Sequence, residues 1–248
     1  TNMEYLEDQK YDNAEEIYDQ SRILSSKLTF TTIDQIFKFP FKYKGYEKIY
    51  ATLAYSKVVI DEIQAYSPEI VAIILKGLEM IHNIGGKFMI MTATLPPFYI
   101  DYLKDRKIID ENYSVIGKFL GKKIRHKIKV NEKPILDDIN KILEKGKTNK
   151  VIVIVNTVNR AIELYNEISK YKTDNVHLLH SMFIQKHREI LEVKIKAFSD
   201  NKTDKGIWIT TQIVEASLDV DFDYLFTELS PLDSLFQRLG RCYRQRQF

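Results

Sequence analysis

The chain has 248 residues, enough for one large α/β domain or for two smaller domains that each have a core of their own. Hydrophobic residues make up 44% and charged residues 29%, as in ordinary soluble globular proteins, and the net charge of +3 does not by itself indicate a nucleic-acid partner. A single cysteine excludes a disulfide framework and favours a cytoplasmic protein, and no apolar run is long enough to span a membrane.

The first half of the sequence predicts buried parallel strands that alternate with helices. Residues 28–39 predict a short strand that runs into a helix, with Asp34 as the helix N-cap. Residues 57–60 and 88–91 are apolar runs typical of buried strands, and residues 68–84 have the apolar spacing of a helix that ends at Gly85.

The second half repeats this alternation after a basic stretch at residues 116–130, which we take as the domain junction. Strands are expected near residues 151–155, 176–179, 206–210 and 223–226, and helices at 134–143, 157–171 and 184–198. Strands that alternate with helices predict parallel sheets covered on both faces. The sequence therefore predicts two tandem α/β lobes, residues 1–118 and 119–248.

Polar residues follow two of the predicted strands of the first lobe. Asp61 and Glu62 come directly after one strand, where Asp61 can hold Mg²⁺ and Glu62 can orient and deprotonate an attacking water. An acidic pair that merely caps the next helix is the alternative, and so short a pattern favours it when taken alone. Thr92 and Thr94 follow the next strand, and their hydroxyls are expected to bridge to the acidic loop.

The basic pattern near the C-terminus is the strongest functional signal. Gln237, Arg238, Arg241 and Arg244 fall in one predicted helix, and arginines three apart lie on one helix face. Two arginines spaced in this way can stabilise the charge on a transferring γ-phosphate. A basic helix face that is merely solvated remains the alternative. Gly240 inside the helix would indicate close approach by another group, since glycine costs about 1 kcal/mol there.

Two further segments contain small polar residues. Residues 210–221 place Thr211 at a predicted helix N-terminus, which suits a nucleic-acid phosphate, and Asp219 can accept from a ribose hydroxyl. A short N-capped helix with solvated acids is the alternative. Gly146-Lys147-Thr148 looks like the end of a phosphate loop, but Lys141 stands where the first glycine should be, so we predict a surface turn.

The order of these patterns resembles that of superfamily 2 helicases. Asp61-Glu62-Ile63-Gln64 resembles the DEAD/DEAH box, and Thr92-Ala93-Thr94 resembles the S/T-A-T motif. Further motifs of the two lobes are resembled by residues 31–35, 155–161, 179–181, 211–223 and 237–244. The sequence of these segments is most similar to the helicase–nuclease of type I CRISPR systems, over roughly residues 29–244.

The resemblance implies two RecA-like lobes, the first truncated at its N-terminus, with ATP and Mg²⁺ as cofactors. It implies catalytic roles for Asp61, Glu62, Gln64, Gln237, Arg241 and Arg244, with Asp61 at the metal, and nucleotide contacts for Asp219 and Arg238. It implies nucleic-acid contacts for Thr31, Thr32, Ser181 and Thr211, and coupling between the lobes through Thr92 and Thr94.

The partners implied by the resemblance are unwound, single-stranded DNA, a guide-RNA surveillance complex and a nuclease domain of the HD type in cis or in trans. The phosphate loop and the HD signature are not found in these 248 residues, so we expect a fragment that alone is inactive in ATP hydrolysis. An RNA helicase of the same superfamily, or a helicase-like fragment that only binds nucleic acid or a partner, are the alternative functions.

Overall fold

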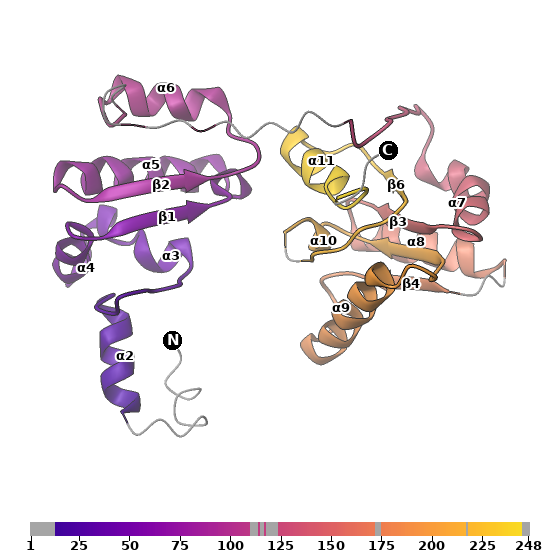
Figure 1. The fold of residues 1–248 in the computed structure, drawn as a ribbon, viewed down its shortest axis with the longest axis horizontal. Coiled ribbons are helices and arrows are strands. Elements are labelled where there is room, and N and C mark those ends of the chain that lie inside the picture. The colour runs from indigo at the N-terminus through magenta and orange to yellow at the C-terminus, as the bar shows by residue number, and fades with distance from the viewer. Residues whose placement is uncertain are drawn as a thin grey trace. The chain divides into compact units, whose positions relative to one another are not determined.

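The computed structural model describes residues 13–109, 114, 117, 124–171, 175–216 and 218–244. The chain divides into two compact units, Thr1–Lys118 and Phe119–Phe248, and each is treated by itself (Figure 1). Both units contain parallel strands flanked by helices, so the predicted α/β class is confirmed. In the described residues, no helix is both long and apolar enough to cross a membrane.

The first unit contains a two-stranded parallel sheet and helices packed around it. Its elements are α2 (Ala14–Arg22), α3 (Ile33–Ile36), the 3-10 helix η1 (Phe39–Phe41), α4 (Tyr46–Leu53), β1 (Lys57–Asp61), the 3-10 helix η2 (Ile63–Ala65), α5 (Pro68–Asn83), β2 (Lys87–Met91) and α6 (Pro97–Asp105). The strands are in register from Lys57 opposite Lys87 to Asp61 opposite Met91. Their carboxyl ends therefore lie side by side, which places the predicted acidic loop next to Thr92.

Helix α5 supplies much of the first core. Its apolar residues recur at helical spacing, which places Val71, Ile74 and Leu78 on one buried face of the helix. These residues belong to the same hydrophobic core as Val58 and Ile60 of β1. The turn that follows α5 needs glycine for two different reasons. Gly85 has a φ of +87°, and a Cβ at Gly86 would lie 2.4 Å from the carbonyl oxygen of Leu53.

The second unit has a four-stranded parallel sheet with the order β4-β5-β3-β6. Its elements are the 3-10 helix η3 (Ile135–Asp138), α7 (Ile139–Gly146), β3 (Lys150–Ile154), α8 (Val158–Ser169), β4 (Val176–Leu179), α9 (Gln185–Asp200), β5 (Gly206–Thr210), α10 (Ile213–Ala216), β6 (Tyr224–Thr227) and α11 (Leu232–Leu239). The central strands β3 and β5 are buried along their whole length, as their continuous apolar runs predict.

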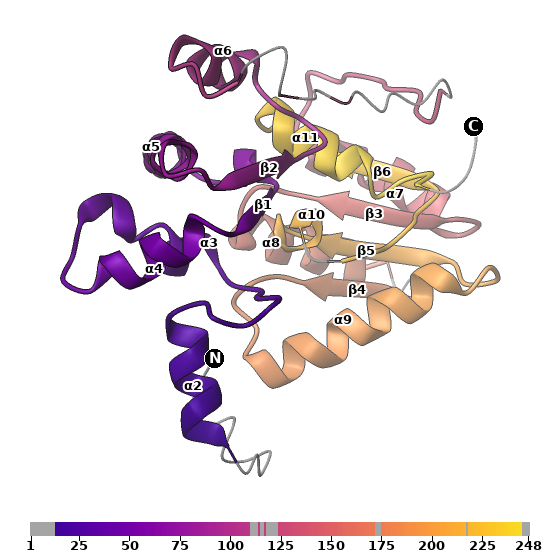
Figure 2. The same cartoon turned by 60° about the vertical axis from the view of Figure 1, so that its left-hand side comes forward.

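Alternate residues of these central strands enter two different cores. Ile152 and Trp208 pack on the face covered by α9 and α10, whereas Val153 and Ile209 pack on the face covered by α7 and α8 (Figure 2). The carboxyl ends of β3, β5 and β6 meet at one edge of the sheet, where Asn156, Thr211 and Glu228 follow the strands. This edge is where ligands bind in open parallel sheets.

Two local predictions were wrong. Residues 28–32 form no strand in the described structure, and α3 begins at Ile33 with Thr32 as its N-cap, so Asp34 lies in the first turn. The physical reason is exposure: the side chains of Leu28 and Phe30 are 75% and 89% exposed, which leaves this segment without the burial of a sheet strand.

The predicted C-terminal helix is also shorter than expected. Helix α11 ends at Leu239 with Gly240 as its C-cap, so Arg241 and Arg244 lie in the following turn and do not share a helix face with Arg238. Pairing with the backbone of Phe222 ends the helix: the N–H of Phe222 donates to the Arg241 carbonyl at 2.9 Å. Within the described part of the chain, a Cβ at Gly240 would meet the backbone of residues 236 and 237 at 3.2 Å or more, so the expected close approach by another group is not seen there.

Candidate active site

The acidic loop begins at the last residue of β1. Asp61 is exposed there, and Glu62 has a left-handed backbone with φ +50° and ψ +50°. Its N–H donates to the carbonyl of Met91 at 2.9 Å, which ties the loop to the end of β2. A left-handed conformation costs a non-glycine residue roughly 1–3 kcal/mol, and such conformations cluster at functional sites. The strained turn carries the Glu62 carboxylate toward Gln64 and Thr92.

Three side chains form a hydrogen-bonded cluster at the ends of the two strands. Gln64 Nε2 donates to the Glu62 carboxylate, and the Thr92 hydroxyl donates to Gln64 Oε1. The N–H of Thr94 donates to Thr92 Oγ1 at 3.1 Å and fixes that hydroxyl. Gln64 is buried, whereas Glu62 is partly exposed. The amide of Gln64 therefore orients a carboxylate that still faces solvent, as the predicted bridge from the threonine motif requires.

Thr94, the second threonine of this motif, differs from Thr92 in its hydrogen bonding. Thr94 Oγ1 is buried, and among the described residues it has no hydrogen-bond partner. Buried hydroxyls are nearly always paired, because leaving one unpaired costs about 1–3 kcal/mol. Its predicted role in coupling the lobes remains a prediction.

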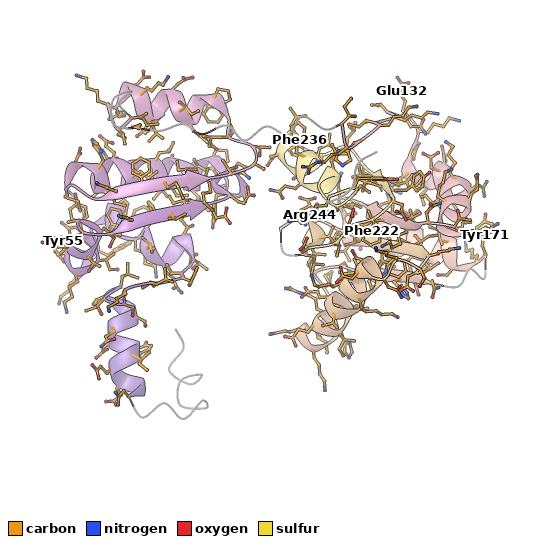
Figure 3. All side chains as sticks on the ribbon, viewed as in Figure 1. Tyr55, Glu132, Tyr171, Phe222, Phe236 and Arg244 are labelled. Atoms are coloured by element: carbon orange, nitrogen blue, oxygen red, sulfur yellow. The ribbon has the colours of Figure 1, made fainter. Side chains whose placement is uncertain are left out.

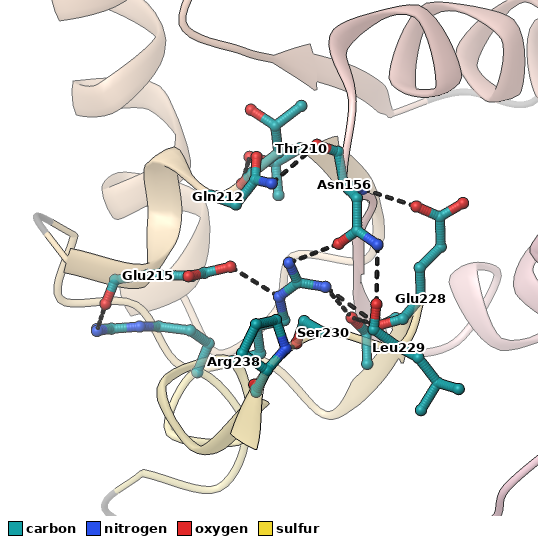
Figure 4. Close-up of polar contacts among 12 residues, drawn as sticks. Asn156, Thr210, Gln212, Glu215, Glu228, Leu229, Ser230 and Arg238 are labelled. Atoms are coloured by element: carbon teal, nitrogen blue, oxygen red, sulfur yellow. Dashed lines mark hydrogen bonds and ion pairs between the residues drawn. The ribbon is translucent and has the colours of Figure 1, made fainter. Parts of the chain in front are cut away.

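Arg238 is the centre of a polar network in the second unit (Figure 4). Its side chain is 1% exposed, and its Nε donates to Glu215 Oε1 at 2.7 Å. The other guanidinium nitrogens donate to Asn156 Oδ1 at 2.8 Å, to Thr227 Oγ1 at 2.8 Å and to the Glu228 carbonyl at 3.1 Å. Arg238 therefore fastens α11 to α10 and to the ends of β3 and β6.

This burial bears on the predicted nucleotide contact of Arg238. In this arrangement the guanidinium faces the interior of the unit, so the structure gives Arg238 a positioning role and the nucleotide contact stays a prediction. Sequence reasoning did not single out Glu215 and Glu228 as its partners. Their signal is available only in hindsight: Glu228 directly follows β6, and Glu215 lies in α10, the short helix that comes after β5.

The other two arginines differ in their surroundings. Arg241 is partly buried, and its guanidinium donates to the backbone carbonyls of Glu215 and Leu218. Arg244 is exposed, and its guanidinium forms an ion pair with Asp219 at 3.1 Å, while its backbone N–H donates to Asp221 Oδ1 at 3.0 Å. Arg244, which is labelled in Figure 3, is thus exposed, whereas Arg241, the other predicted phosphate-contacting arginine, is partly buried.

The remaining predicted residues do not all reach a surface. Thr31 and Thr32 are exposed in the first unit, and Ser181 is exposed just after β4. Thr211 is only 3% exposed, so in this arrangement its hydroxyl does not offer a strand contact. Gln237 is partly exposed on α11. The nucleic-acid roles of these residues stay predictions.

A buried histidine lies beside Ser181. The ring of His180 is 4.2 Å from that of Phe183 and stacks on it, and burial lowers the pKa of His180 below its ordinary value. The side chain is therefore held neutral at the end of β4. No cluster of three or more potential metal ligands occurs in the described parts of either unit. The metal role expected of Asp61 stays a prediction.

Comparison with known proteins defines the class. Residues 147–247 match the family described as "CRISPR-associated nuclease/helicase Cas3, C-terminal". The Cas3 nuclease/helicase of Methanothermobacter thermautotrophicus is 33% identical over 98% of this chain and 31% of its own length. In sequence and fold the chain thus resembles helicases of superfamily 2. More particularly, it is similar to the CRISPR-associated nuclease/helicases named Cas3, so the predicted resemblance is confirmed.

Solved structures agree on the fold. The match to the crystal structure of T. fusca Cas3-AMPPNP covers 86% of this chain and 30% of the T. fusca chain, with a TM-score of 0.71 and 21% sequence identity. A chain of a "CRISPR RNA-guided surveillance complex, pre-nicking" covers 91% of this chain and 33% of its own, with a TM-score of 0.72 and 20% identity. The chain thus spans about a third of the length of the proteins that it matches.

Proposed function

We propose that the full-length protein containing this chain is an ATP-dependent DNA helicase that unwinds target DNA for degradation in CRISPR interference. In this proposal residues 1–118 are part of the first RecA-like lobe and residues 119–248 form the second. The observation that carries the proposal is the cluster of Glu62, Gln64 and Thr92 at the carboxyl ends of β1 and β2. It presents an oriented carboxylate where a nucleotide-driven enzyme needs one.

The residues present fit a magnesium-bound nucleotide. Asp61 is an exposed carboxylate at a strand end, and carboxylate oxygens are the ligands that Mg²⁺ prefers. Asp61 would hold the ion, which would supply positive charge to neutralise the phosphate oxygens of the nucleotide. Glu62 accepts the proton of the attacking water, and Gln64 keeps the Glu62 carboxylate pointed at it.

The arginines of the second unit supply the charge that the transition state requires. Arg244 exchanges its exposed ion pair with Asp219 for the γ-phosphate, and Arg241 lies three residues before it. The proposed partners are unwound DNA, an RNA-guided surveillance complex and an HD nuclease. The word nuclease in the relatives' names supports the last of these, and the name of one matching structure supports the surveillance complex. The 248-residue chain alone hydrolyses ATP negligibly, because no phosphate loop is found in its sequence.

ATP turnover by the full-length protein tests the proposal. It is measured without nucleic acid, with single-stranded DNA and with single-stranded RNA of the same sequence. We expect stimulation by DNA. Stimulation by RNA alone would favour an RNA helicase, and DNA binding without turnover would favour a non-catalytic binding protein.

A further inference from the structure

The turn that follows α11 carries the two predicted phosphate-contacting arginines and contains a left-handed residue. Tyr243, which lies between Arg241 and Arg244 in the chain, has a φ of +51°. A residue with a side chain rarely adopts this conformation, so it persists only where the surrounding contacts hold it. The path of the backbone at Tyr243 decides where the Arg244 side chain leaves the turn. The contacts that hold this turn therefore bear on where Arg244 is presented.

One set of contacts comes from the residues that precede β6. The N–H of Tyr243 donates to the carbonyl of Phe222 at 3.3 Å. The N–H of Arg244 donates to Asp221 Oδ1 at 3.0 Å, and the N–H of Phe222 donates to the carbonyl of Arg241 at 2.9 Å. These bonds fix the turn from the side of the sheet.

A second set of contacts comes from a segment near the start of the second unit. Residues 124–130 form neither helix nor strand, and all of them except His126 are exposed. The Nε2 atom of His126 lies 2.7 Å from the carbonyl oxygen of Cys242, which is 116 positions away in the chain. A carbonyl oxygen only accepts hydrogen bonds, so the imidazole donates from Nε2. The one side chain of this segment that turns inward is thus bonded to the arginine turn.

The residue before His126 reaches the same turn. Arg125 Nη1 donates to the carbonyl of Arg244 at 3.4 Å. A bond of that length from an exposed side chain is weak, so the shorter bond from His126 is the main contact. Two neighbouring residues of an otherwise exposed segment therefore hold the turn from a second side.

We propose that His126 is a positioning residue for ATP hydrolysis, which holds the turn of residues 241–244 so that Arg244 is presented to the γ-phosphate. The inference rests on the proposed function, because it requires Arg244 to act as the arginine finger. His126 acts through the Cys242 carbonyl and contacts neither nucleotide nor water. With the turn held from two sides, the Arg244 backbone stays in place when its side chain leaves Asp219. Such precision matters because a displacement of about 1 Å can lower a rate about 100-fold.

The test compares two amide variants of the full-length protein. His126→Gln places an amide nitrogen at about the reach of the imidazole Nε2, whereas the amide of His126→Asn is one methylene shorter and falls short of the Cys242 carbonyl. We expect His126→Asn to lower kcat for DNA-stimulated ATP hydrolysis roughly 5- to 150-fold, as for a buried acceptor that loses its donor, with KM for ATP nearly unchanged. His126→Gln should retain most of the activity. His187→Asn is the control, since His187 is exposed on α9.

Hydrogen exchange followed by mass spectrometry gives a second readout that needs neither ATP nor DNA. In His126→Asn the amides of Tyr243 and Arg244 should exchange about 5-fold or more faster than in the wild type, because the turn opens more often. Exchange in β3, a central strand of the sheet, should stay unchanged, which shows that the variant is folded. His126→Gln and His187→Asn should exchange like the wild type at both places.

A double variant separates positioning from a general loss of stability. Turnover is measured for Arg244→Ala with and without His126→Asn. If His126 acts through Arg244, His126→Asn should lower turnover much less in the Arg244→Ala background than in the wild type. An equal loss in both backgrounds would overturn the proposal, as would equal kcat values for the Asn and Gln variants.

The outcomes also separate this inference from the proposed function. Low turnover in Arg244→Ala, combined with wild-type exchange and turnover in His126→Asn, would overturn the role of His126 alone. Normal turnover in Arg244→Ala would refute the arginine finger and, with it, the positioning role of His126, even if exchange in His126→Asn were faster.

Discussion

Arg238 and Glu215 form an ion pair in the interior of the second unit, with 2.7 Å between Nε and Oε1. Their side chains are 1% and 8% exposed. The pair is enclosed by further bonds from Arg238 to Asn156 and Thr227, so each charge is compensated where water does not reach it. The same arginine that sequence reasoning assigned to nucleotide binding thus holds the edge of the sheet together.

We expect Arg238→Ala to destabilise the second unit by about 3–5 kcal/mol, because the substitution leaves the Glu215 carboxylate buried without its partner. Urea unfolding of the 248-residue chain measures the change. Arg188→Ala is the control: Arg188 pairs with Glu192 on the surface of α9, and such exposed pairs contribute about 0–1 kcal/mol. A loss as small as that of the control would contradict the positioning role.

Arg244→Ala in the full-length protein should lower ATP turnover by about 10³- to 10⁵-fold with little loss of DNA affinity, because an arginine finger meets charge that develops in the transition state. The Arg244 side chain is exposed and pairs with Asp219, and such an exposed ion pair is weak enough to be exchanged for a phosphate. Turnover and DNA binding are measured on the same variant. Normal turnover with weaker, less salt-sensitive DNA binding would instead make Arg244 a DNA contact.

Thr92→Val in the full-length protein tests whether the threonine orients the Gln64 amide. Valine has nearly the shape of threonine and lacks the hydroxyl that donates to Gln64 Oε1. We expect kcat to fall roughly 5- to 150-fold, the effect of about 1–3 kcal/mol for one unsatisfied buried group. Thr92→Ser keeps the hydroxyl and should restore most of the activity. Equal kcat values for the valine and serine variants would exclude the orienting role.

The stability of the second unit should fall as the pH drops below about 6.5. Burial, and secondarily the positive charge of Lys194, lower the pKa of His177, whose ring lies 4.7 Å from that of Trp208. The unfolded chain therefore takes up a proton at a pH where the folded chain does not, and acid favours unfolding. His180 acts in the same direction, since its pKa is also lowered by burial.

Urea unfolding at several pH values between 7.5 and 5.5 measures this dependence. His177→Gln should flatten the decline, whereas His187→Gln, which changes an exposed residue of α9, should leave it unchanged. A decline that is equally steep in the His177 variant would contradict the assignment.

Much of the fold follows from local patterns. The continuous apolar runs at β3 and β5 and the helical spacing in α5 and α8 are properties of the sequence itself, and the structure has these elements within a few residues of the predicted bounds. The end of α11 was not predictable in this way. The helix ends because the backbone around Cys242 pairs with that of Phe222. The two residues are 20 positions apart in the chain, so this pairing leaves no local sequence signal.

The candidate site was also predictable only in part. Adjacent parallel strand ends predict that the acidic loop and Thr92 lie close together, and the structure places them in hydrogen-bond contact. The burial of Arg238 and Thr211 was not predictable, because it arises from tertiary packing of α11 and α10 at the sheet edge. Pattern alone does not distinguish an arginine that faces a ligand from one that faces a buried glutamate.

The measurement that tests the central claim most directly is ATP turnover and ATP binding by the full-length protein with Glu62→Gln. The substitution keeps the size of the side chain and removes the base that activates water. The account predicts that DNA-stimulated turnover is largely abolished while ATP affinity remains near that of the wild type. Undiminished turnover, or a loss of ATP affinity as large as the loss of turnover, would contradict the role of Glu62 as the catalytic base.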